Sequence, residues 1–219
     1  MKVSIVIPVF NQEDYIEDAI KSALGQTYSD FEVIVVNDGS TDRSAEIARS
    51  FEPDVRVVDQ KNKRQAAARN TGIRVANGEF ILPLDADDLI SGNYLKKTVP
   101  LMEDDRVAIV ATGMQYFGER HEYIHPVGVS WRIEKESNEL PCFSLIRNKV
   151  LTEVGGYNES PLIHGMEDWD LWLKILGSGY EVSIIDEPLF FYRVHSGSTC
   201  SQVNSRREEI VKKVKEMHP

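Results

Sequence analysis

The sequence contains only two cysteines, Cys142 and Cys200, and neither belongs to a CxxC pair or to a Cys/His spacing typical of metal sites. We therefore expect two reduced thiols rather than a disulfide or a zinc centre. No apolar run approaches the length of a membrane-spanning helix, and residues 1–4 lead straight into a predicted strand rather than a signal peptide. These absences predict a cytoplasmic protein, whose membrane contact, if any, is peripheral and at the inner face of the cell membrane.

Basic residues and glycine-rich loops are also scarce. The 25 lysines and arginines face 35 acidic residues, for a net charge of -10, so a duplex phosphate backbone would be repelled and nucleic acid is not an expected partner. Neither GxGxxG nor GxxxxGK[ST] occurs, which excludes the dinucleotide oxidoreductases and the P-loop enzymes. A chain of 219 residues with 42% hydrophobic composition is long enough to bury one large core, so the fold needs neither disulfides nor a structural metal.

The first third of the chain alternates apolar runs with helical patterns. Its predicted strands are 3–10, 31–36, 55–58 and 80–84, and its predicted helices are 16–24, 44–51 and 65–76. The first strand is apolar throughout, which indicates a central strand covered on both faces. This order predicts an α/β fold with a mostly parallel central sheet flanked by helices.

The second half is less regular. It predicts helices at 93–102, 148–154, 164–176 and 205–217, and strands at 107–116, 142–146, 182–185 and 189–194. The stretch from Gly118 to Glu139 has no clear assignment. No repeat or linker separates a second domain.

Polar clusters follow the predicted strands directly. Asn11, Asp38 and the run Asp85–Asp88 each come after a strand, where ligands bind in sheets of this kind. Asp85 and Asp87 together can share a hard divalent cation, Mg²⁺ or Mn²⁺. The alternative is an acidic loop that caps the next helix. A diphosphate would then need a basic partner, for which Arg69 and Lys63 or Arg64 are the nearest candidates. The alternative for Arg69 is a solvated charge on the helix face.

Five motifs, in order, resemble the family 2 glycosyltransferases of the GT-A fold. They are Val6-Ile7-Pro8-Val9-Phe10-Asn11, Val36-Asn37-Asp38-Gly39-Ser40-Thr41-Asp42, Ala67-Ala68-Arg69-Asn70, Leu84-Asp85-Ala86-Asp87-Asp88 and Glu167-Asp168-Trp169-Asp170-Leu171-Trp172. The resemblance implies one GT-A domain over residues 1–204, with a nucleotide-binding half at 1–112, an acceptor-binding half at 113–204, and a charged helix at 205–219.

The resemblance also implies the binding residues. The expected donor is a UDP-sugar. The residues that would bind this nucleotide-sugar are Pro8, Phe10, Asn11, Glu13, Asp38, Arg69, Asp85 and Ala86. The resemblance assigns Mn²⁺ or Mg²⁺ to Asp87, Asp85 and His195, whose imidazole suits Mn²⁺ better. In the resemblance Phe10 stacks on the base and Asp38 accepts a hydrogen bond from it. The alternatives are a core role for Phe10 and an ordinary exposed or buried histidine at His195.

The implied reaction is sugar transfer with inversion to a glycan, lipid-linked or protein acceptor. Asp168 matches the general base, and Glu167 is the alternative, because adjacent side chains at a helix start point in different directions. Both could instead merely stabilise the first helical turn. No QxxRW-type sequence follows, which favours addition of one sugar per event in polysaccharide or glycoconjugate synthesis.

Two other functions compete with this prediction. A nucleotidyltransferase would also use an α/β fold and carboxylate-bound metal, but it normally has a glycine-rich basic loop where Phe10-Asn11-Gln12-Glu13 stands. A non-catalytic sugar-nucleotide binding module would be expected to have lost Asp85 and Asp87 or the Glu167-Asp168 pair, and none of these residues is missing.

Overall fold

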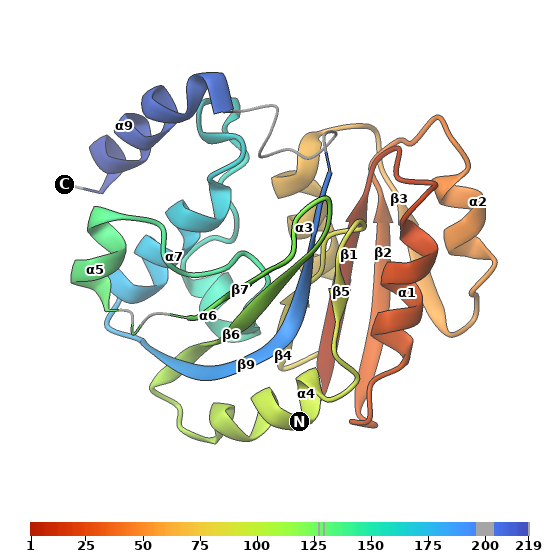
Figure 1. Ribbon diagram of the computed structural model, residues 1–219, viewed down its shortest axis with the longest axis horizontal. Helices are drawn as coiled ribbons and strands as arrows, with labels where there is room; N and C mark the ends of the chain where they lie inside the picture. Colours follow the sequence, from red (N-terminus) through yellow and green to blue (C-terminus); the bar gives the residue numbers. More distant parts are fainter. Residues whose placement is uncertain (127, 129, 196–203, 219) are drawn as a thin grey trace.

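The computed structural model describes residues 1–126, 128, 130–195 and 204–218. Within this part, nine strands form one sheet in the order β3-β2-β1-β4-β8-β6-β9-β5, with β7 paired to β6 (Figure 1). The strands are β1 Val3–Val9, β2 Phe31–Asn37, β3 Val55–Asp59, β4 Phe80–Pro83, β5 Leu89–Ile90, β6 Val107–Gly118, β7 Glu122–Ile124, β8 Leu145–Arg147 and β9 Glu181–Val194. The α-helices are α1 Ile16–Leu24, α2 Ser44–Arg49, α3 Arg64–Val75, α4 Tyr94–Thr98, α5 Trp131–Glu136, α6 Asn148–Glu153, α7 Glu167–Gly177 and α9 Arg207–Met217.

The first four strands form a parallel sheet covered on both faces. All seven residues of β1 are buried between its parallel neighbours β2 and β4. Figure 1 shows α1 and α2 on one side of these strands and α3, α6 and α7 on the other. Gly72 lets α3 approach β1 closely, since a Cβ there would lie 2.3 Å from Cγ1 of Val6. The predicted α/β architecture is confirmed.

Strand pairing is mixed beyond β4. Strand β8 is antiparallel to both β4 and β6, whereas β6 and β9 are parallel. The two strands predicted at 182–185 and 189–194 are one continuous strand, β9, because irregular pairing near Thr112 and Gly113 of β6 absorbs the break in the apolar pattern. Strands β5 and β7 and helix α5 were not predicted from the sequence.

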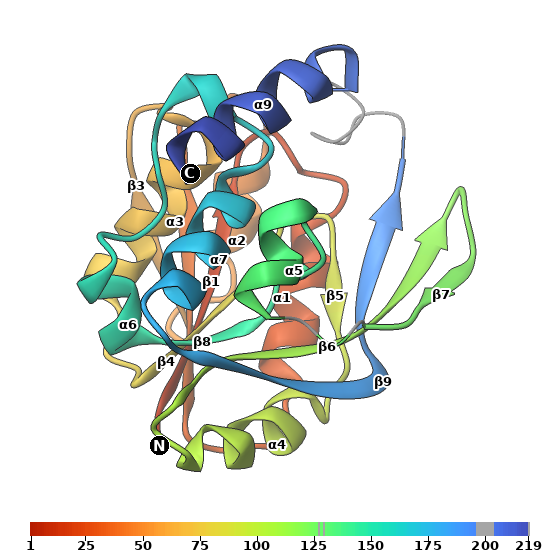
Figure 2. The same cartoon turned by 90° about the vertical axis from the view of Figure 1, so that its left-hand side faces the viewer.

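Helix α9 covers one end of α7 (Figure 2). Ile210 and Val214 of α9 pack against Trp169 and Leu173 of α7, and Nε2 of His218 lies 2.9 Å from Oδ1 of the buried Asp170. The terminal charged helix predicted at 205–217 is observed from Arg207. None of the helices in the described residues is long and apolar enough to cross a membrane.

Candidate active site

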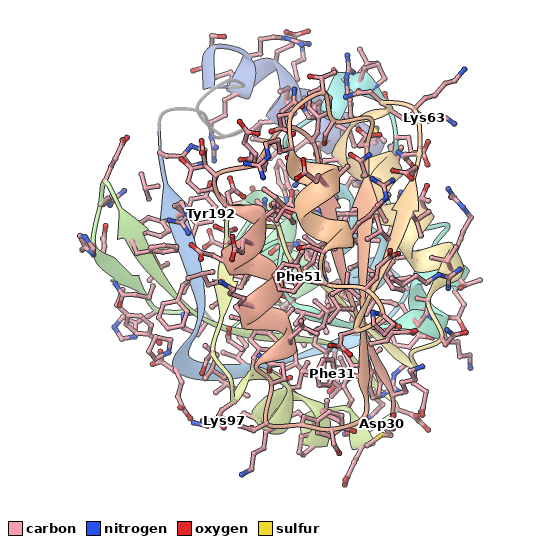
Figure 3. The ribbon with its side chains drawn as sticks, turned by 90° about the vertical axis from the view of Figure 1, so that its right-hand side faces the viewer. Asp30, Phe31, Phe51, Lys63, Lys97 and Tyr192 are labelled. Atoms are coloured by element: carbon pink, nitrogen blue, oxygen red, sulfur yellow. The ribbon has the colours of Figure 1, made fainter. Side chains whose placement is uncertain are left out.

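A cavity of about 370 Å³ lies at the carboxyl ends of β1, β2 and β4. In Figure 3, Phe31 at the start of β2 and Lys63 just before α3 lie at opposite ends of the sheet, and the cavity is at the Lys63 end. Ten of the residues singled out in the sequence line it: Pro8, Phe10, Asp38, Arg64, Arg69, Asp85, Ala86, Asp87, Glu167 and Asp168. The fold therefore brings the ends of three strands and the first turn of α7 to one site.

Phe10 and Asp38 form one end of the cavity. Phe10 is 45% exposed, one residue beyond β1, so it is not a core residue. Asp38 is buried, and its carboxylate accepts hydrogen bonds from the backbone N–H groups of Lys63 and Arg64, both at 2.8 Å, and from Nε2 of Gln60 at 2.7 Å. Asp38 thus accepts hydrogen bonds from backbone N–H groups that have no partner within the helix at the start of α3. It also lines the cavity.

Asn11 and Glu13 lie outside the cavity lining. Oδ1 of Asn11 accepts a hydrogen bond from the backbone N–H of Thr41 at 2.8 Å. Oε2 of Glu13 accepts one from the backbone N–H of Arg43 at 2.9 Å, and the N–H of Glu13 donates to Asp42 at 3.0 Å. These contacts join the loop after β1 to the loop after β2. The structure gives both residues a role in shaping the loops, and their contact with a nucleotide-sugar stays a prediction.

Arg69 connects the two acidic segments beneath the cavity. Its side chain is 3% exposed, its Nη2 donates to Oδ1 of Asp85 at 2.7 Å, and its Nη1 lies 3.6 Å from Oε1 of Glu167. Gln65 donates to the same Asp85 oxygen at 2.7 Å. Burial alone lowers the pKa of Arg69, but the Asp85 carboxylate and the other acidic neighbours more than offset it. Arg69 is therefore not a solvated surface charge.

The predicted metal ligands lie at the acidic edge of the cavity. Nε2 of His195 is 2.9 Å from Oδ2 of Asp87, and both side chains are largely buried. Burial raises the pKa of Asp87, the charge of Asp85 adds to the shift, and the His195 contact opposes it. Among the described residues, no three acidic, histidine or cysteine groups are already arranged to enclose a metal ion. The oxygen and imidazole donors of this edge are of the types that Mn²⁺ and Mg²⁺ take in proteins.

Asp88 supports this edge from behind. It is buried, and its Oδ1 accepts a hydrogen bond from the backbone N–H of Arg193 at 2.8 Å, whereas its Oδ2 has no hydrogen-bond partner among the described residues. The side chain of Arg193 donates to the backbone oxygen of Asp87 at 2.8 Å and packs over the ring of Tyr15. These contacts fix the end of β9, and with it His195, against the Asp85–Asp88 turn.

Asp168 and Glu167 occupy different environments at the start of α7. Glu167 is 3% exposed, and its Oε2 accepts a hydrogen bond from the backbone N–H of Gly165 at 2.7 Å while Arg69 lies beside its other oxygen. Asp168 is less buried, and its Oδ1 accepts from the backbone N–H of Trp169 at 2.9 Å. Burial raises the pKa of Asp168 to about 6, and the charge of Glu167 adds to the shift. A raised pKa is one property that a general base requires, and the role of Asp168 as the base stays a prediction.

Several lining residues were not found from the sequence. They are Val9, Gln12, Asn62, Gln65, Ala68, Cys142, His164, Gly165 and Tyr192. Most lie outside the five motifs, and neutral side chains give no chemical signal of their own; the position of Gln65 one turn before Arg69 on the same helix is the one available clue. Cys142 is a free thiol whose pKa is raised by burial, and Cys200 lies outside the described residues.

Comparison with known proteins identifies the family. A family model described as glycosyl transferase family 2 matches residues 4–159, which is more than half of the chain. The chain belongs to glycosyl transferase family 2. A second model, described as the N-terminal domain of galactosyltransferase, matches residues 125–196 of this glycosyltransferase. The uncharacterized glycosyltransferase RT0329 of Rickettsia typhi is 31% identical over 94% of the chain, which spans 68% of that relative.

Solved structures show the same GT-A fold. S. aureus TarS 1-349 in complex with UDP-GlcNAc superposes with a TM-score of 0.79 at 23% identity, over 92% of this glycosyltransferase and 61% of that chain. The mannosyltransferase PcManGT from Pyrobaculum calidifontis, in complex with GDP-Man and Mn²⁺, gives a TM-score of 0.72 at 22% identity. The match covers 95% of this glycosyltransferase and 61% of that chain. The present chain thus spans about three fifths of each solved protein. Family membership favours a glycosyltransferase over the nucleotidyltransferase alternative.

Proposed function

We propose that this glycosyltransferase moves one sugar per event from a UDP-sugar to a glycan, lipid-linked or protein acceptor, with inversion at the anomeric carbon. The observation that carries the proposal is that one cavity joins an exposed aromatic ring, an edge of acidic side chains and a carboxylate, Asp168, whose pKa is raised to about 6 by burial. A nucleobase, a diphosphate and an acceptor hydroxyl need these three environments in this order.

The nucleotide would bind between Phe10 and Asp38. The exposed face of Phe10 offers a stacking surface for a base, and Asp38 is held rigidly by the start of α3 beside it. Oδ2 of Asp38 accepts one hydrogen bond, from Arg64, which leaves an acceptor position for a ring N–H. A uracil fits this arrangement, and TarS, with the same fold, binds UDP-GlcNAc.

The diphosphate would lie at the acidic edge. Asp87, His195 and Asp85 would hold Mn²⁺ or Mg²⁺, which when bound neutralises the charge that develops on the departing diphosphate. Support comes from the oxygen and nitrogen donors that meet there, and from PcManGT, whose complex contains Mn²⁺. Arg69 would orient Asp85 and the sugar from below.

Asp168 would act as the general base. Its carboxylate takes the proton of an acceptor hydroxyl, whose oxygen then attacks the anomeric carbon while the bond from that carbon to the diphosphate breaks. Attack from the face opposite the leaving group inverts the configuration. Glu167 is held by Gly165 and positioned beside Arg69, so it would orient the start of α7 instead of accepting the proton. The donor would occupy the half of the domain at 1–112, and the acceptor the half at 113–204.

A thermal-shift screen tests the donor assignment. UDP-, GDP-, dTDP- and CMP-sugars are added to the protein with and without Mn²⁺. A ligand at 100 times its dissociation constant stabilises a protein by about 2.7 kcal/mol, which is readily measured. We expect the largest Mn²⁺-dependent shift with a UDP-sugar. A shift with none of the nucleotide-sugars would contradict the proposed function.

A further inference from the structure

Two tyrosines continue the cavity wall outward. Tyr192 of β9 lines the cavity, and Tyr116 of β6 is its direct partner in the parallel pairing of the two strands. Their ring centroids lie 5.4 Å apart, and the ring planes are inclined by 47°. Figure 2 shows the ends of β6, β7 and β9 rising together at one side of the molecule, and Figure 3 shows Tyr192 on β9 beside α1.

A charged pair lies next to Tyr116. The guanidinium of Arg120 is 5.1 Å from the ring centroid of Tyr116, and it forms an ion pair with Glu122 of β7, the residue opposite Tyr116 in the antiparallel pairing. The side chains of Arg120 and Glu122 are 58% and 44% exposed. Tyr192, Tyr116, Arg120 and Glu122 therefore form a continuous surface that leaves the cavity, which we name the aromatic ridge.

The chemistry of the aromatic ridge suits a sugar ring. A pyranose has a face of polarised C–H groups, which an electron-rich aromatic face attracts, and a rim of hydroxyl groups. Carboxylate and guanidinium groups pair with such hydroxyls as acceptor and donor. Because Tyr192 and Asp168 line the same cavity, a sugar placed against Tyr192 can extend a hydroxyl towards the proposed base.

We propose that the aromatic ridge is an acceptor subsite that recognises a saccharide, so that the acceptor of this glycosyltransferase is a glycan. This inference rests on the proposed function and narrows its acceptor to one chemical class. Tyr192 contacts the sugar that receives the transfer, Tyr116 supports that ring, and Arg120 with Glu122 binds hydroxyls of the next sugar.

The surroundings favour a saccharide over a lipid chain. An acyl or prenyl chain needs a continuous apolar channel, and the exposed large apolar residues of the described part are scattered: Met1, Phe10, Leu101, Leu162 and Met217. Phe10 lies in the nucleotide end of the cavity. The aromatic ridge instead combines two neighbouring rings with an exposed ion pair.

The test compares substitutions on the two faces of one hairpin. Tyr116→Ala removes the supporting ring and Tyr116→Phe keeps it. Tyr123→Ala is the matched control, because Tyr123 lies on β7 opposite Gln115 and its hydroxyl donates to Asp186, on the other face of the strands. The probes are a printed glycan array, read in the presence of UDP and Mn²⁺, and the methyl glycosides and disaccharides that the wild-type protein accepts. Transfer to saccharide and hydrolysis of the donor by water are measured together.

We expect Tyr116→Ala to raise the acceptor KM about three- to tenfold, the loss typical of one aromatic contact, and to lower the ratio of transfer to hydrolysis. Tyr116→Phe should retain the wild-type ratio, and Tyr123→Ala should behave as the wild type. Equal acceptor KM in Tyr116→Ala and Tyr123→Ala would overturn the inference, as would transfer to a prenyl phosphate or a peptide with no saccharide bound. A wild-type protein that neither binds UDP nor hydrolyses any donor would instead contradict the proposed function.

Discussion

Nη2 of Arg69 donates a 2.7 Å hydrogen bond to Oδ1 of Asp85 beneath the cavity. The same guanidinium lies 3.6 Å from Oε1 of Glu167. One buried cation therefore joins the turn after β4 to the start of α7, two segments that are far apart in the sequence. This contact connects the residues proposed to handle the diphosphate with the segment that carries the proposed base.

Removing this cation should destabilise the protein. Arg69→Ala leaves the buried Glu167 and the partly buried Asp85 without their shared partner, and loss of one member of a buried ion pair costs about 3 to 5 kcal/mol. Urea unfolding at pH 7 measures the change. Arg74→Ala, an exposed arginine on the same helix, should change stability by no more than about 0.5 kcal/mol. Equal stability of the two variants would contradict the bridging role of Arg69.

Asp168 should determine the acid limb of the pH profile. Because the pKa of Asp168 is raised to about 6, the base is deprotonated above this pH, and kcat/KM should fall as the pH drops through 6. Asp168→Asn should lower kcat by about 10² to 10⁴-fold, whereas Glu167→Gln should cost less. Donor hydrolysis provides the assay. If Asp168→Asn kept a kcat near that of the wild type while Glu167→Gln lost activity, Glu167 would be the general base and Asp168 would orient the start of α7.

The same raised pKa affects folding. A carboxyl group whose pKa is higher in the folded state than in the unfolded state opposes folding once it ionises, so its unfavourable contribution is absent at pH 3, grows between pH 4 and pH 6 and is complete above pH 6. Asp168→Asn should therefore stabilise the protein by about 1 to 3 kcal/mol at pH 7.5 and hardly at all at pH 3.5. Urea unfolding at the two pH values measures this difference. If Asp168→Asn raised the free energy of unfolding equally at both, burial of the Asp168 charge would not be the cause.

Asp87 should make nucleotide binding depend on a divalent cation. In Asp87→Ala, UDP should bind no more tightly with Mn²⁺ than with EDTA, because the proposed metal site has lost the carboxylate that contacts His195. Asp54→Ala, an exposed aspartate before β3, should keep the Mn²⁺ response of the wild type. Calorimetric titration gives both affinities. Wild-type affinity of Asp87→Ala in Mn²⁺, with a full Mn²⁺ response, would remove Asp87 from the metal site.

Asp38 should affect both binding and stability. Asp38→Ala removes the acceptor for the backbone N–H groups of Lys63 and Arg64 as well as a base contact, so we expect UDP to bind about 1 to 3 kcal/mol more weakly and the free energy of unfolding to fall by about 1 to 2 kcal/mol. Calorimetry and urea unfolding measure the two effects separately. Unchanged UDP affinity in a folded variant would move the base pocket elsewhere.

The sequence predicted the first half of the fold and many of the residues that line the candidate cavity, for a physical reason. In Val3–Val9 and Phe31–Asn37, buried parallel strands leave long apolar runs, and polar residues such as Asp38 and Asp85 stand out where these runs stop. The family assignment drawn from these motifs is confirmed.

The rest depends on contacts between distant segments. Tyr192 reaches the cavity because β9 pairs with both β5 and β6, a register that no local pattern specifies. Strand β5 has two residues, too few for any periodicity. The second role of Asp38, at the start of α3, was equally hidden, because its partners are backbone N–H groups 25 and 26 positions away.

Proton NMR of the sugar released from the donor tests the central claim most directly. The protein is incubated with Mn²⁺ and the UDP-sugar that gives the largest thermal shift, and the anomeric signal is followed from the first minutes, before the free sugar equilibrates. The account predicts that the sugar released to water first appears with the opposite anomeric configuration to the donor, and that Asp168→Asn slows its release. Release with the donor's own configuration, or release at the wild-type rate by Asp168→Asn, would contradict it.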